Sequence, residues 1–263
     1  MLTDVHVPDD VPAAVSLIAA GGTAMGGGTS LMPWLNDYAS PPTTLVSLRR
    51  AGLSGVHLGG STVTIGAATT LGQIENDEDL NPVVRSIASV PVRNLATVGG
   101  NLFAHQPHGD LAVALVALDA RVTLFDETGT RELPVEDFVT AERPAALVTA
   151  VAFDRPAPGT FKYLKAARRR FNSVSIVTVA ATITESDGLV TGARVALGGV
   201  APTIVRARAV EAALIGGPLT EATVRDAAQA GLAEIAPADD AYASAWYRTR
   251  VFPVHLRRAL LGH

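Results

Sequence analysis

The sequence predicts an α+β protein built from two unequal parts. Short strand and helix patterns alternate through the first 150 or so residues, three longer strand patterns then follow one another, and the final third is helical. Between the two parts, residues 154–159 contain Pro156, Pro158 and Gly159, a composition typical of a linker. We therefore expect two domains, at residues 1–156 and 157–263.

The N-terminal part begins with an amphipathic helix, expected at residues 11–20. Asp9 or Asp10 can cap it, Pro12 suits its first turn, and the glycine pair at 21–22 ends it. Residues 23–25 and 44–48 predict short strands. A hairpin is expected from strands 56–58 and 62–66 around a further glycine pair.

The middle of the chain alternates again. A short helix is expected at 71–76, a second from the Asn-Pro pair at 81–82 to about residue 90, and a turn at 91–94. Asp110 is expected to begin a helix at 111–118. Strands are expected at 120–125 and 132–135, joined by a turn at Thr128-Gly129, and at 146–153.

The C-terminal part predicts three antiparallel strands followed by helices. The strands are expected at 160–166, 174–184 and 189–197, the last two joined by the turn Ser186-Asp187-Gly188. Helices are expected at 205–215, 221–235 and 242–261. Pro253 should kink or interrupt the last of these, because proline removes a helix hydrogen bond.

The composition excludes several kinds of protein. Hydrophobic residues make up 48% of the 263 residues, enough for a sizeable core, and the net charge of −4 offers no basic field for nucleic acid. The absence of cysteine excludes disulfides, thiolate metal sites and a Cys-ligated iron–sulfur cluster in this chain. No signal peptide or membrane-spanning apolar run is seen, so a cytoplasmic protein is expected.

Two glycine-rich segments carry the main functional hypothesis. The first is Ala24-Met25-Gly26-Gly27-Gly28-Thr29-Ser30, and the second is Thr97-Val98-Gly99-Gly100-Asn101, followed by Gly109-Asp110. Glycine-rich turns bind anions through backbone N–H groups, so two such loops could hold one dinucleotide pyrophosphate. The first segment matches neither the Rossmann nor the Walker A pattern, and a tight strand-to-helix turn is the alternative.

Polar residues near the second segment have two readings each. Asn101 could occupy a positive-φ turn position or bind a ligand. Asp110 could accept hydrogen bonds from ligand hydroxyls or a ring N–H, although the local pattern favours a helix N-cap. His105 and His108 have H-x-x-H spacing, but a metal site needs a third ligand. Exposed loop histidines, or contacts to an organic ligand, are the alternatives.

Two further clusters stand in the C-terminal part. Lys165 and the run Arg168-Arg169-Arg170 form a solvated strand edge or a contact for an anionic cofactor or an electron-transfer partner. The last helix carries Trp246, Tyr247, Arg248, Arg250, Arg257 and Arg258. These residues form a partner interface, or the aromatics pack inward while the arginines stay in water.

Across almost its whole length the chain resembles the FAD-binding medium subunits of molybdenum hydroxylases, the carbon monoxide dehydrogenase and xanthine dehydrogenase group. The motifs that carry this resemblance are residues 25–31 (MGGGTSL), 92–101 (VRNLATVGGN), 107–110 (PHGD), 117–121 (ALDAR), 198–202 (GGVAP), 247–248 (YR) and 256–260 (LRRAL). The fold it implies is a PCMH-type FAD-binding domain of two subdomains, then a smaller domain with a three-stranded antiparallel sheet and a helix bundle.

The resemblance also implies which residues hold FAD. The two glycine segments would bind the pyrophosphate and the neighbouring sugar and ring, Asp110 would contact the flavin side, and Lys165 would approach the isoalloxazine. The complete implied set is Ala24, Met25, Gly26, Gly27, Gly28, Thr29, Ser30, Leu31, Ala88, Thr97, Gly99, Gly100, Asn101, Phe103, Ala104, Gly109, Asp110, Leu147 and Lys165. No catalytic residue and no metal ligand is assigned.

The function implied by the resemblance is electron transfer. A large subunit would carry the molybdenum cofactor, a small subunit would carry two [2Fe–2S] clusters, and FAD here would pass electrons to NAD⁺, a quinone, a cytochrome or O₂. The assembly implied is a dimer of heterotrimers. A free-standing flavin oxidase or dehydrogenase, with His105 or His108 as its only candidate base, and a flavin-less scaffold subunit are the alternatives.

Overall fold

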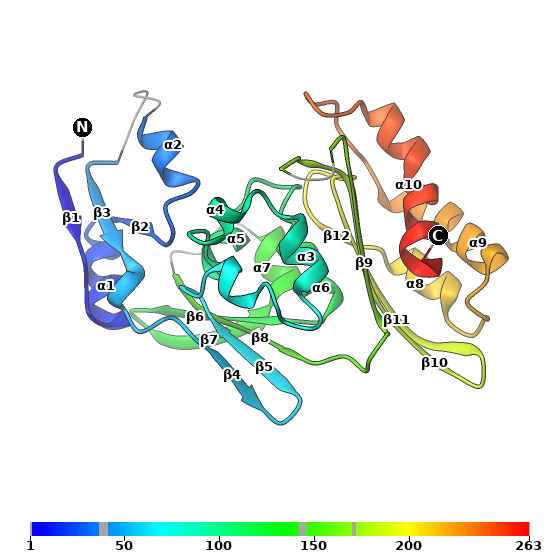
Figure 1. Ribbon diagram of the computed structural model, residues 1–263, viewed down its shortest axis with the longest axis horizontal. Coiled ribbons are helices and arrows are strands. Elements are labelled where there is room, and N and C mark those ends of the chain that lie inside the picture. Colours follow the sequence, from blue (N-terminus) through cyan, green and yellow to red (C-terminus); the bar gives the residue numbers. More distant parts are fainter. Residues whose placement is uncertain (1, 37–41, 142–145, 170–171, 263) are drawn as a thin grey trace.

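The computed structural model describes residues 2–36, 42–141, 146–169 and 172–262. It contains three β-sheets placed side by side, with helices between and outside them (Figure 1). The first two sheets come from the N-terminal part of the chain and the third from the C-terminal part. The α+β class and the two-part order predicted from the sequence are confirmed.

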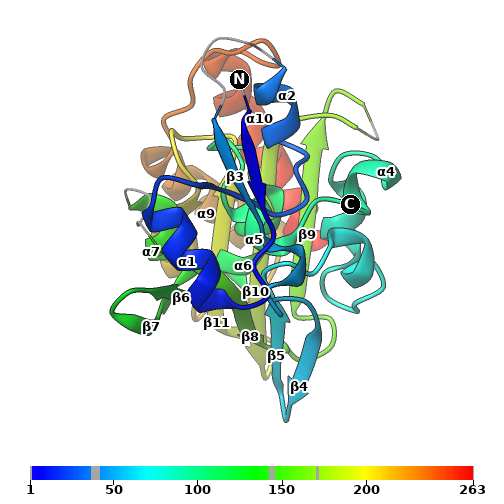
Figure 2. The same ribbon diagram turned by 90° about the vertical axis from the view of Figure 1, so that its left-hand side faces the viewer.

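The first sheet is small and parallel, with strand order β1-β3-β2. Its strands are β1 (Asp4–His6), β2 (Thr23–Met25) and β3 (Thr44–Ser47), of which β1 was not predicted. Helix α1 (Val11–Ala19) packs against it through Ala14 and Val15, capped by Asp10 as expected. Figure 2 turns this sheet and α1 toward the viewer.

The second sheet is antiparallel and has five strands in the order β4-β5-β8-β6-β7. The strands are β4 (Val56–Gly59), β5 (Thr62–Gly66), β6 (Arg121–Asp126), β7 (Gly129–Pro134) and β8 (Leu147–Asp154). Both predicted hairpins are present. After β7 the chain forms α7 (Val135–Thr140), which was not predicted.

Short helices lie against this sheet and lead toward the third one. They are α3 (Asn81–Ser86), α4 (Val90–Arg93), α5 (Val98–Leu102) and α6 (Asp110–Ala117), with 3₁₀ turns at Leu48–Arg50 and Leu71–Ile74. The single helix expected from residue 81 to 90 is wrong. It ends at Ser86 because Ile87 is extended and Ala88 has φ +45°, and the Pro91 segment, expected as a turn, opens α4.

The third sheet is antiparallel, in the order β12-β11-β10-β9. The three expected strands are β9 (Phe161–Ala167), β10 (Ser175–Ser186) and β11 (Leu189–Gly198), and the short β12 (Val205–Arg206) adds a fourth at one edge. Helices α8 (Arg208–Leu214), α9 (Glu221–Gly231) and α10 (Ala245–Leu261) follow, with a 3₁₀ turn at Leu232–Glu234. Helix α10 continues through Pro253, so that residue does not interrupt it.

Both faces of the third sheet are buried, and alternate residues of β10 divide between them. Val177, Val179 and Ala181 belong to a core shared with α8, α9 and α10. Ala180 belongs instead to the core formed with α6 and the second sheet. Because side chains alternate across a strand, β10 joins two separate cores.

The segment predicted as a linker is held in place. Arg155 donates hydrogen bonds to the carboxylates of Asp77 at 2.9 Å and Asp79 at 2.7 Å, which lie between the Leu71–Ile74 turn and α3. Burial raises the pKa of Asp79, and the Arg155 charge acts in the opposite direction. No described helix combines the length and apolar composition required to span a bilayer.

Candidate functional site

The first glycine segment connects β2 to the short helix α2 (Leu31–Leu35). Gly28 has φ +73°, a left-handed conformation that strains any residue with a side chain, and its carbonyl accepts from the Met32 amide at 2.8 Å. Ser30 occupies the N-cap position of α2, but its hydroxyl makes no capping hydrogen bond. The chain thus turns sharply here and exposes backbone.

The second glycine segment is the beginning of a helix rather than a loop. Thr97 is the N-cap of α5, and its hydroxyl accepts from the Gly100 amide at 3.1 Å. Asn101 lies inside α5 and has no positive φ, so the turn position considered for it is wrong. The threonine cap organises the glycine pair into helix.

The two glycine segments touch each other, which explains several of their glycines. A Cβ on Gly27 would collide with the carbonyl oxygen of Leu95, and one on Gly26 would lie 2.6 Å from the Thr97 hydroxyl oxygen. A Cβ on Gly99 would lie 2.7 Å from the Cβ of Ala67. A side chain at Gly26 or Gly27 would push the two segments apart, and one at Gly99 would push α5 away from Ala67.

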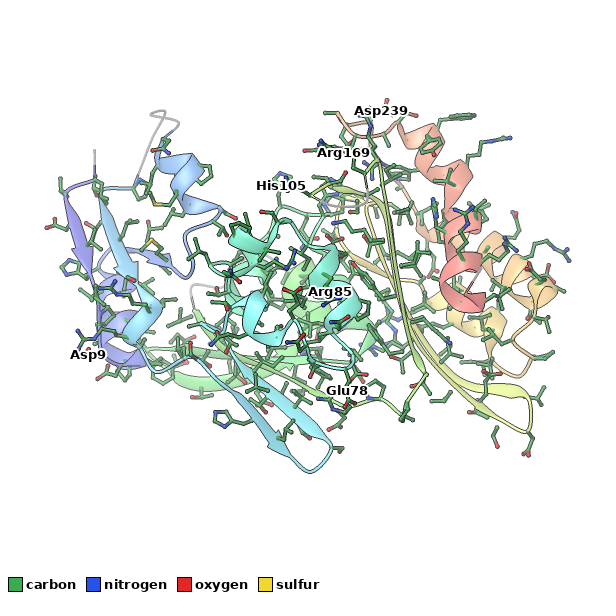
Figure 3. All side chains as sticks on the ribbon, in the orientation of Figure 1. Asp9, Glu78, Arg85, His105, Arg169 and Asp239 are labelled. Carbon is green, nitrogen blue, oxygen red and sulfur yellow. The ribbon has the colours of Figure 1, made fainter. Side chains whose placement is uncertain are left out.

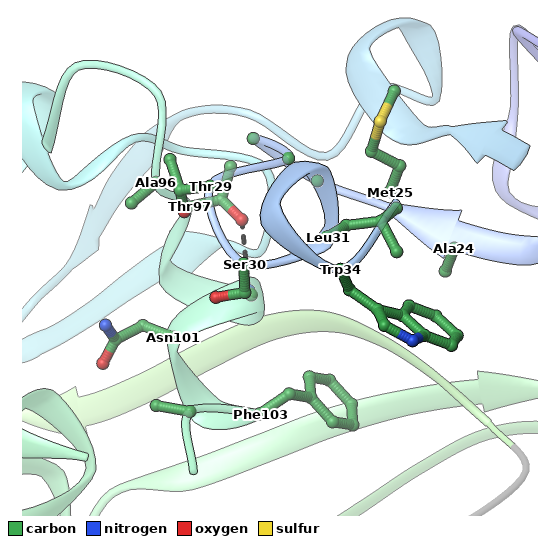
Figure 4. A pocket seen from close by; sticks show the side chains of 15 residues that line it. Ala24, Met25, Thr29, Ser30, Leu31, Trp34, Ala96, Thr97, Asn101 and Phe103 are labelled. Carbon is green, nitrogen blue, oxygen red and sulfur yellow. Dashed lines mark hydrogen bonds between the residues drawn. The ribbon is translucent and has the colours of Figure 1, made fainter. Parts of the chain in front are cut away.

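A pocket with a volume of about 400 Å³ opens where the segments meet (Figure 4). Its volume is within the range of small-molecule sites. Its lining contains no charged side chain. The lining residues are Ala24, Met25, Gly26, Gly27, Gly28, Thr29, Ser30, Leu31, Trp34, Ala96, Thr97, Gly100, Asn101, Phe103 and Ala104.

A second, apolar pocket of about 130 Å³ shares part of this lining. It extends the site toward β8 and α1. Its other lining residues are Ile18, Leu48, Ala67, Ala68, Gly99, Ala146, Leu147 and Val148. The two pockets together bring fifteen of the nineteen sequence-predicted residues to one place, and Ala88, Gly109, Asp110 and Lys165 line neither.

Two observations fit this site to a dinucleotide. The side-chain oxygen of Asn101 is buried and has no hydrogen-bond partner among the described residues, and a buried polar atom left unpaired costs free energy unless a ligand satisfies it. In addition, Gly28 lines the pocket with φ +73°, a conformation that favours glycine, so no side chain covers the backbone at this turn. An uncharged pocket with exposed backbone suits a diphosphate held by N–H groups.

Trp34 is the most prominent lining residue that sequence reasoning missed. Its side chain lies at the pocket, and the residue is 45% exposed (Figure 4). Trp34 stands only three residues after Leu31, the last residue of the glycine-rich motif, and this position could have been taken as a signal for a place in the pocket. The remaining missed residues are small or apolar and carry no such signal.

Asp110 and Lys165 form a buried ion pair outside the pocket. Their carboxylate and ammonium groups are 2.7 Å apart, with side chains 8% and 7% exposed. The second oxygen of Asp110 accepts from Thr178 at 2.9 Å, and the ammonium also donates to the Ser86 carbonyl at 2.9 Å. The pair therefore ties α6 and α3 to the third sheet.

The expectation that Asp110 caps its helix is wrong. Gly109 is the N-cap of α6 and Asp110 is the first helical residue, with its carboxylate taken up by Thr178 and Lys165. Beside it, burial raises the pKa of Tyr163 well above its usual value of 10. The Asp110 charge acts in the same direction, and the hydrogen bond to Ser86 acts against both.

The remaining candidates lie elsewhere. Ala88 lies in the break between α3 and α4. His105 is exposed, whereas His108 is only 20% exposed, so the expectation of two exposed histidines is wrong for His108. Its ring nitrogens lie 3.4 Å from the Ser175 hydroxyl and 3.5 Å from Asp240. The described residues contain no group of three or more side chains arranged for a metal ion.

The C-terminal helix reverses one expected arrangement. Trp246 and Tyr247 are 68% and 42% exposed, whereas Arg248 is 1% exposed. The Arg248 guanidinium donates to the carbonyls of Ile176 at 2.6 Å and Gly199 at 2.8 Å. The aromatics therefore face outward and this arginine inward. In the basic cluster, Arg168 and Arg169 are exposed, and Arg170 lies outside the described residues.

Comparison with known proteins identifies the family. Residues 2–154 match "FAD binding domain in molybdopterin dehydrogenase", and residues 162–262 match "CO dehydrogenase flavoprotein C-terminal domain". The medium chain of carbon monoxide dehydrogenase from Afipia carboxidovorans is 30% identical over 98% of this chain and 95% of its own. Subunit alpha of the 6-hydroxypseudooxynicotine dehydrogenase complex from Paenarthrobacter nicotinovorans is 30% identical over 98% and 93%.

The structural comparison agrees. A carbon monoxide dehydrogenase structure from Hydrogenophaga pseudoflava superposes with a TM-score of 0.92 at 29% identity, covering 99% of this chain and 96% of the other. The match runs through all three sheets, since it covers nearly every residue. This chain belongs to the FAD-binding flavoprotein subunits of the molybdenum-containing dehydrogenases, an oxidoreductase family that includes the carbon monoxide dehydrogenase medium chains.

Proposed function

We propose that this chain is an electron-transfer subunit that binds FAD in the pocket between the two glycine segments. The observation that carries the proposal is the uncharged pocket of about 400 Å³ with the unpartnered Asn101 oxygen in its lining. The backbone of residues 26–30 and the Thr97 to Asn101 segment would hold the diphosphate and the groups beside it. Bound FAD supplies the electron-transfer chemistry, and the protein binds and orients it.

We further propose that electrons arrive from other chains. This chain has no cysteine, so a Cys-ligated [2Fe–2S] cluster must be carried by a small partner subunit. A large subunit would hold the molybdenum cofactor and oxidise the substrate, and the assembly would be a dimer of heterotrimers. Two relatives, one named as a medium chain and the other as a subunit of a complex, support this arrangement.

The division into domains at residues 1–156 and 157–263 is also proposed. The proposed boundary falls between the two matched ranges and just after β8 ends at Asp154. The free-standing oxidase is less well supported, because neither His105 nor His108 lines the two pockets of the site. A flavin-less scaffold remains an outcome of the experiment.

The visible spectrum of the purified chain tests the proposal. Flavin bands that pass through a filter after denaturation would support non-covalent FAD, and flavin retained on the chain would favour the oxidase. A colourless chain that takes up no added FAD would leave the scaffold. Gly100→Leu should abolish flavin uptake, because a Cβ there would already lie 2.9 Å from the Thr97 hydroxyl oxygen. Gly59→Leu, where nothing lies within 4 Å of the added Cβ, is the control.

A further inference from the structure

A small basic pocket lies beside the Asp110–Lys165 pair, where β9 ends. It has a volume of about 230 Å³ and is lined by Ser86, Lys165, Ala167, Arg168, Arg169 and Ser173. None of these residues lines the two pockets of the candidate site. β9 is one of the two edge strands of the third sheet, and Figure 3 shows Arg169 near its end.

Lys165 is neutralised by Asp110, but the other two cations of this pocket have no counter-charge among the residues that the structure describes. Arg168 and Arg169 form no ion pair or hydrogen bond with any residue that the structure describes, in contrast to Arg155, Arg194 and Arg206. The two arginines are consecutive and exposed in a chain whose net charge is −4, and solvent or a bound anion can screen their charges.

The other polar groups of the pocket are also donors. An ammonium group has three N–H bonds, and Lys165 uses two hydrogen-bond partners, Asp110 and the Ser86 carbonyl. The third N–H therefore has no partner in the described part of the chain. The Ser173 hydroxyl makes only a 3.5 Å contact with the carbonyl of its neighbour Val174. The pocket thus offers donors of three chemical kinds, and no carboxylate lines it.

We propose that this pocket binds a phosphate or diphosphate group of a small molecule. Guanidinium groups bind such oxyanions through paired hydrogen bonds. After Asp110 balances Lys165, the two arginines leave two formal positive charges, which match a doubly charged phosphate better than a single carboxylate. The pocket is much smaller than a whole dinucleotide needs, so it holds one end of its ligand.

This inference deepens the proposed function and rests on it for its biological meaning. If FAD lies in the glycine pocket, its own diphosphate is already held there, and the phosphate bound beside Lys165 belongs to a second molecule. That molecule is a phosphorylated electron acceptor or effector, and it approaches the third sheet at the end of β9 where this pocket lies. The two probes described next, pyrophosphate and adenosine diphosphate, distinguish a free phosphate from one carried by a nucleotide.

The test titrates inorganic pyrophosphate, and separately adenosine diphosphate, into the FAD-loaded chain by calorimetry in a phosphate-free buffer. Saturable binding is expected, weakened at least about 10-fold in the Arg168→Ala, Arg169→Ala double variant, since each charged hydrogen bond contributes that much. Arg168→Lys, Arg169→Lys should fall between, because lysine keeps the charge but not the paired geometry. Arg49→Ala, Arg258→Ala is the control, since both arginines are exposed and make no ion pair or hydrogen bond with a described residue.

The outcomes separate this inference from the proposed function. If neither pyrophosphate nor adenosine diphosphate binds the unaltered chain, or if the double-alanine variant binds them equally well, the proposed phosphate site is refuted. Tighter binding of adenosine diphosphate than of pyrophosphate would assign the phosphate to a nucleotide, and the reverse would assign it to a free anion. A chain that takes up no FAD refutes the proposed function, yet pyrophosphate binding that still depends on Arg168 and Arg169 would uphold the pocket.

Discussion

Replacing Lys165 by Met tests whether the buried ion pair matters to the fold as its geometry implies. The change keeps most of the side-chain volume but leaves the Asp110 carboxylate, which is 8% exposed, with Thr178 as its remaining side-chain partner. A buried charge stripped of its partner costs about 3–5 kcal/mol. For a chain of this size that corresponds to a fall in melting temperature on the order of 10 °C.

A matched control is available on the surface. Arg50 and Asp9 are also 2.7 Å apart, but their side chains are 63% and 73% exposed. Arg50→Met should therefore change the free energy of unfolding by about 1 kcal/mol or less. The double variant Asp110→Leu, Lys165→Met should recover most of the lost stability, because it removes both charges together.

The assay is thermal unfolding of the FAD-free chain, so that ligand binding does not mask the change. Equal shifts for Lys165→Met and Arg50→Met would refute the argument that burial, rather than distance, sets the energy of the pair. A double variant as unstable as Lys165→Met would show that lost packing, and not the unpaired carboxylate, causes the effect.

Three further predictions follow from the site and its surroundings. Gly27→Ala should weaken FAD binding at least about 10-fold, since its Cβ would meet the Leu95 carbonyl, whereas Gly59→Ala should not; flavin absorbance in an equilibrium titration measures both, and equal affinities would contradict the contact between the segments. Trp34→Ala should weaken FAD binding up to about 10-fold through loss of aromatic contact, and the same titration should find Trp246→Ala, also exposed but outside the pocket, unchanged. Burial, and then the Arg248 charge, lower the pKa of His108 in the folded chain, so the unfolded chain binds more protons and stability should fall as the pH drops below about 6.5. Denaturant unfolding between pH 7.5 and 5 should show a smaller loss for His108→Gln, and an unchanged slope would exclude this histidine as a cause.

Local signals in the sequence predicted most strands and helix starts correctly. Asp10 and Pro12 mark the start of α1, the glycine pair at 21–22 marks its end, and the pair at 59–60 marks the β4–β5 hairpin. These signals could be recognised because each residue affects the backbone only within a few positions of its own. The helix break at Ile87 and Ala88 was not predicted. Neither residue is a breaker by type, so no local signal in the sequence predicts the positive φ of Ala88.

The glycine pocket could be located from sequence, but the partners of Asp110 could not be derived from local pattern. Thr178 and Lys165 lie far along the chain from Asp110, and no local spacing relates them. Local pattern instead favoured a helix cap, which Gly109 provides. The resemblance did select Lys165, although as a flavin contact rather than as an ion-pair partner. The inward Arg248 was missed for the same reason, since its partners Ile176 and Gly199 come from another region.

The two-sided burial of the third sheet has a consequence for dissecting this protein. Ala180 and Ala196 pack into the core of the N-terminal half, while Val179 and Val195 pack against the C-terminal helices. A fragment beginning at residue 157 would expose the sheet face that carries Ala180 and Ala196. In the complementary fragment, helix α6 would lose the sheet that covers it. The two halves should aggregate when produced apart, but should remain associated when proteolysis nicks the completed protein between β8 and β9.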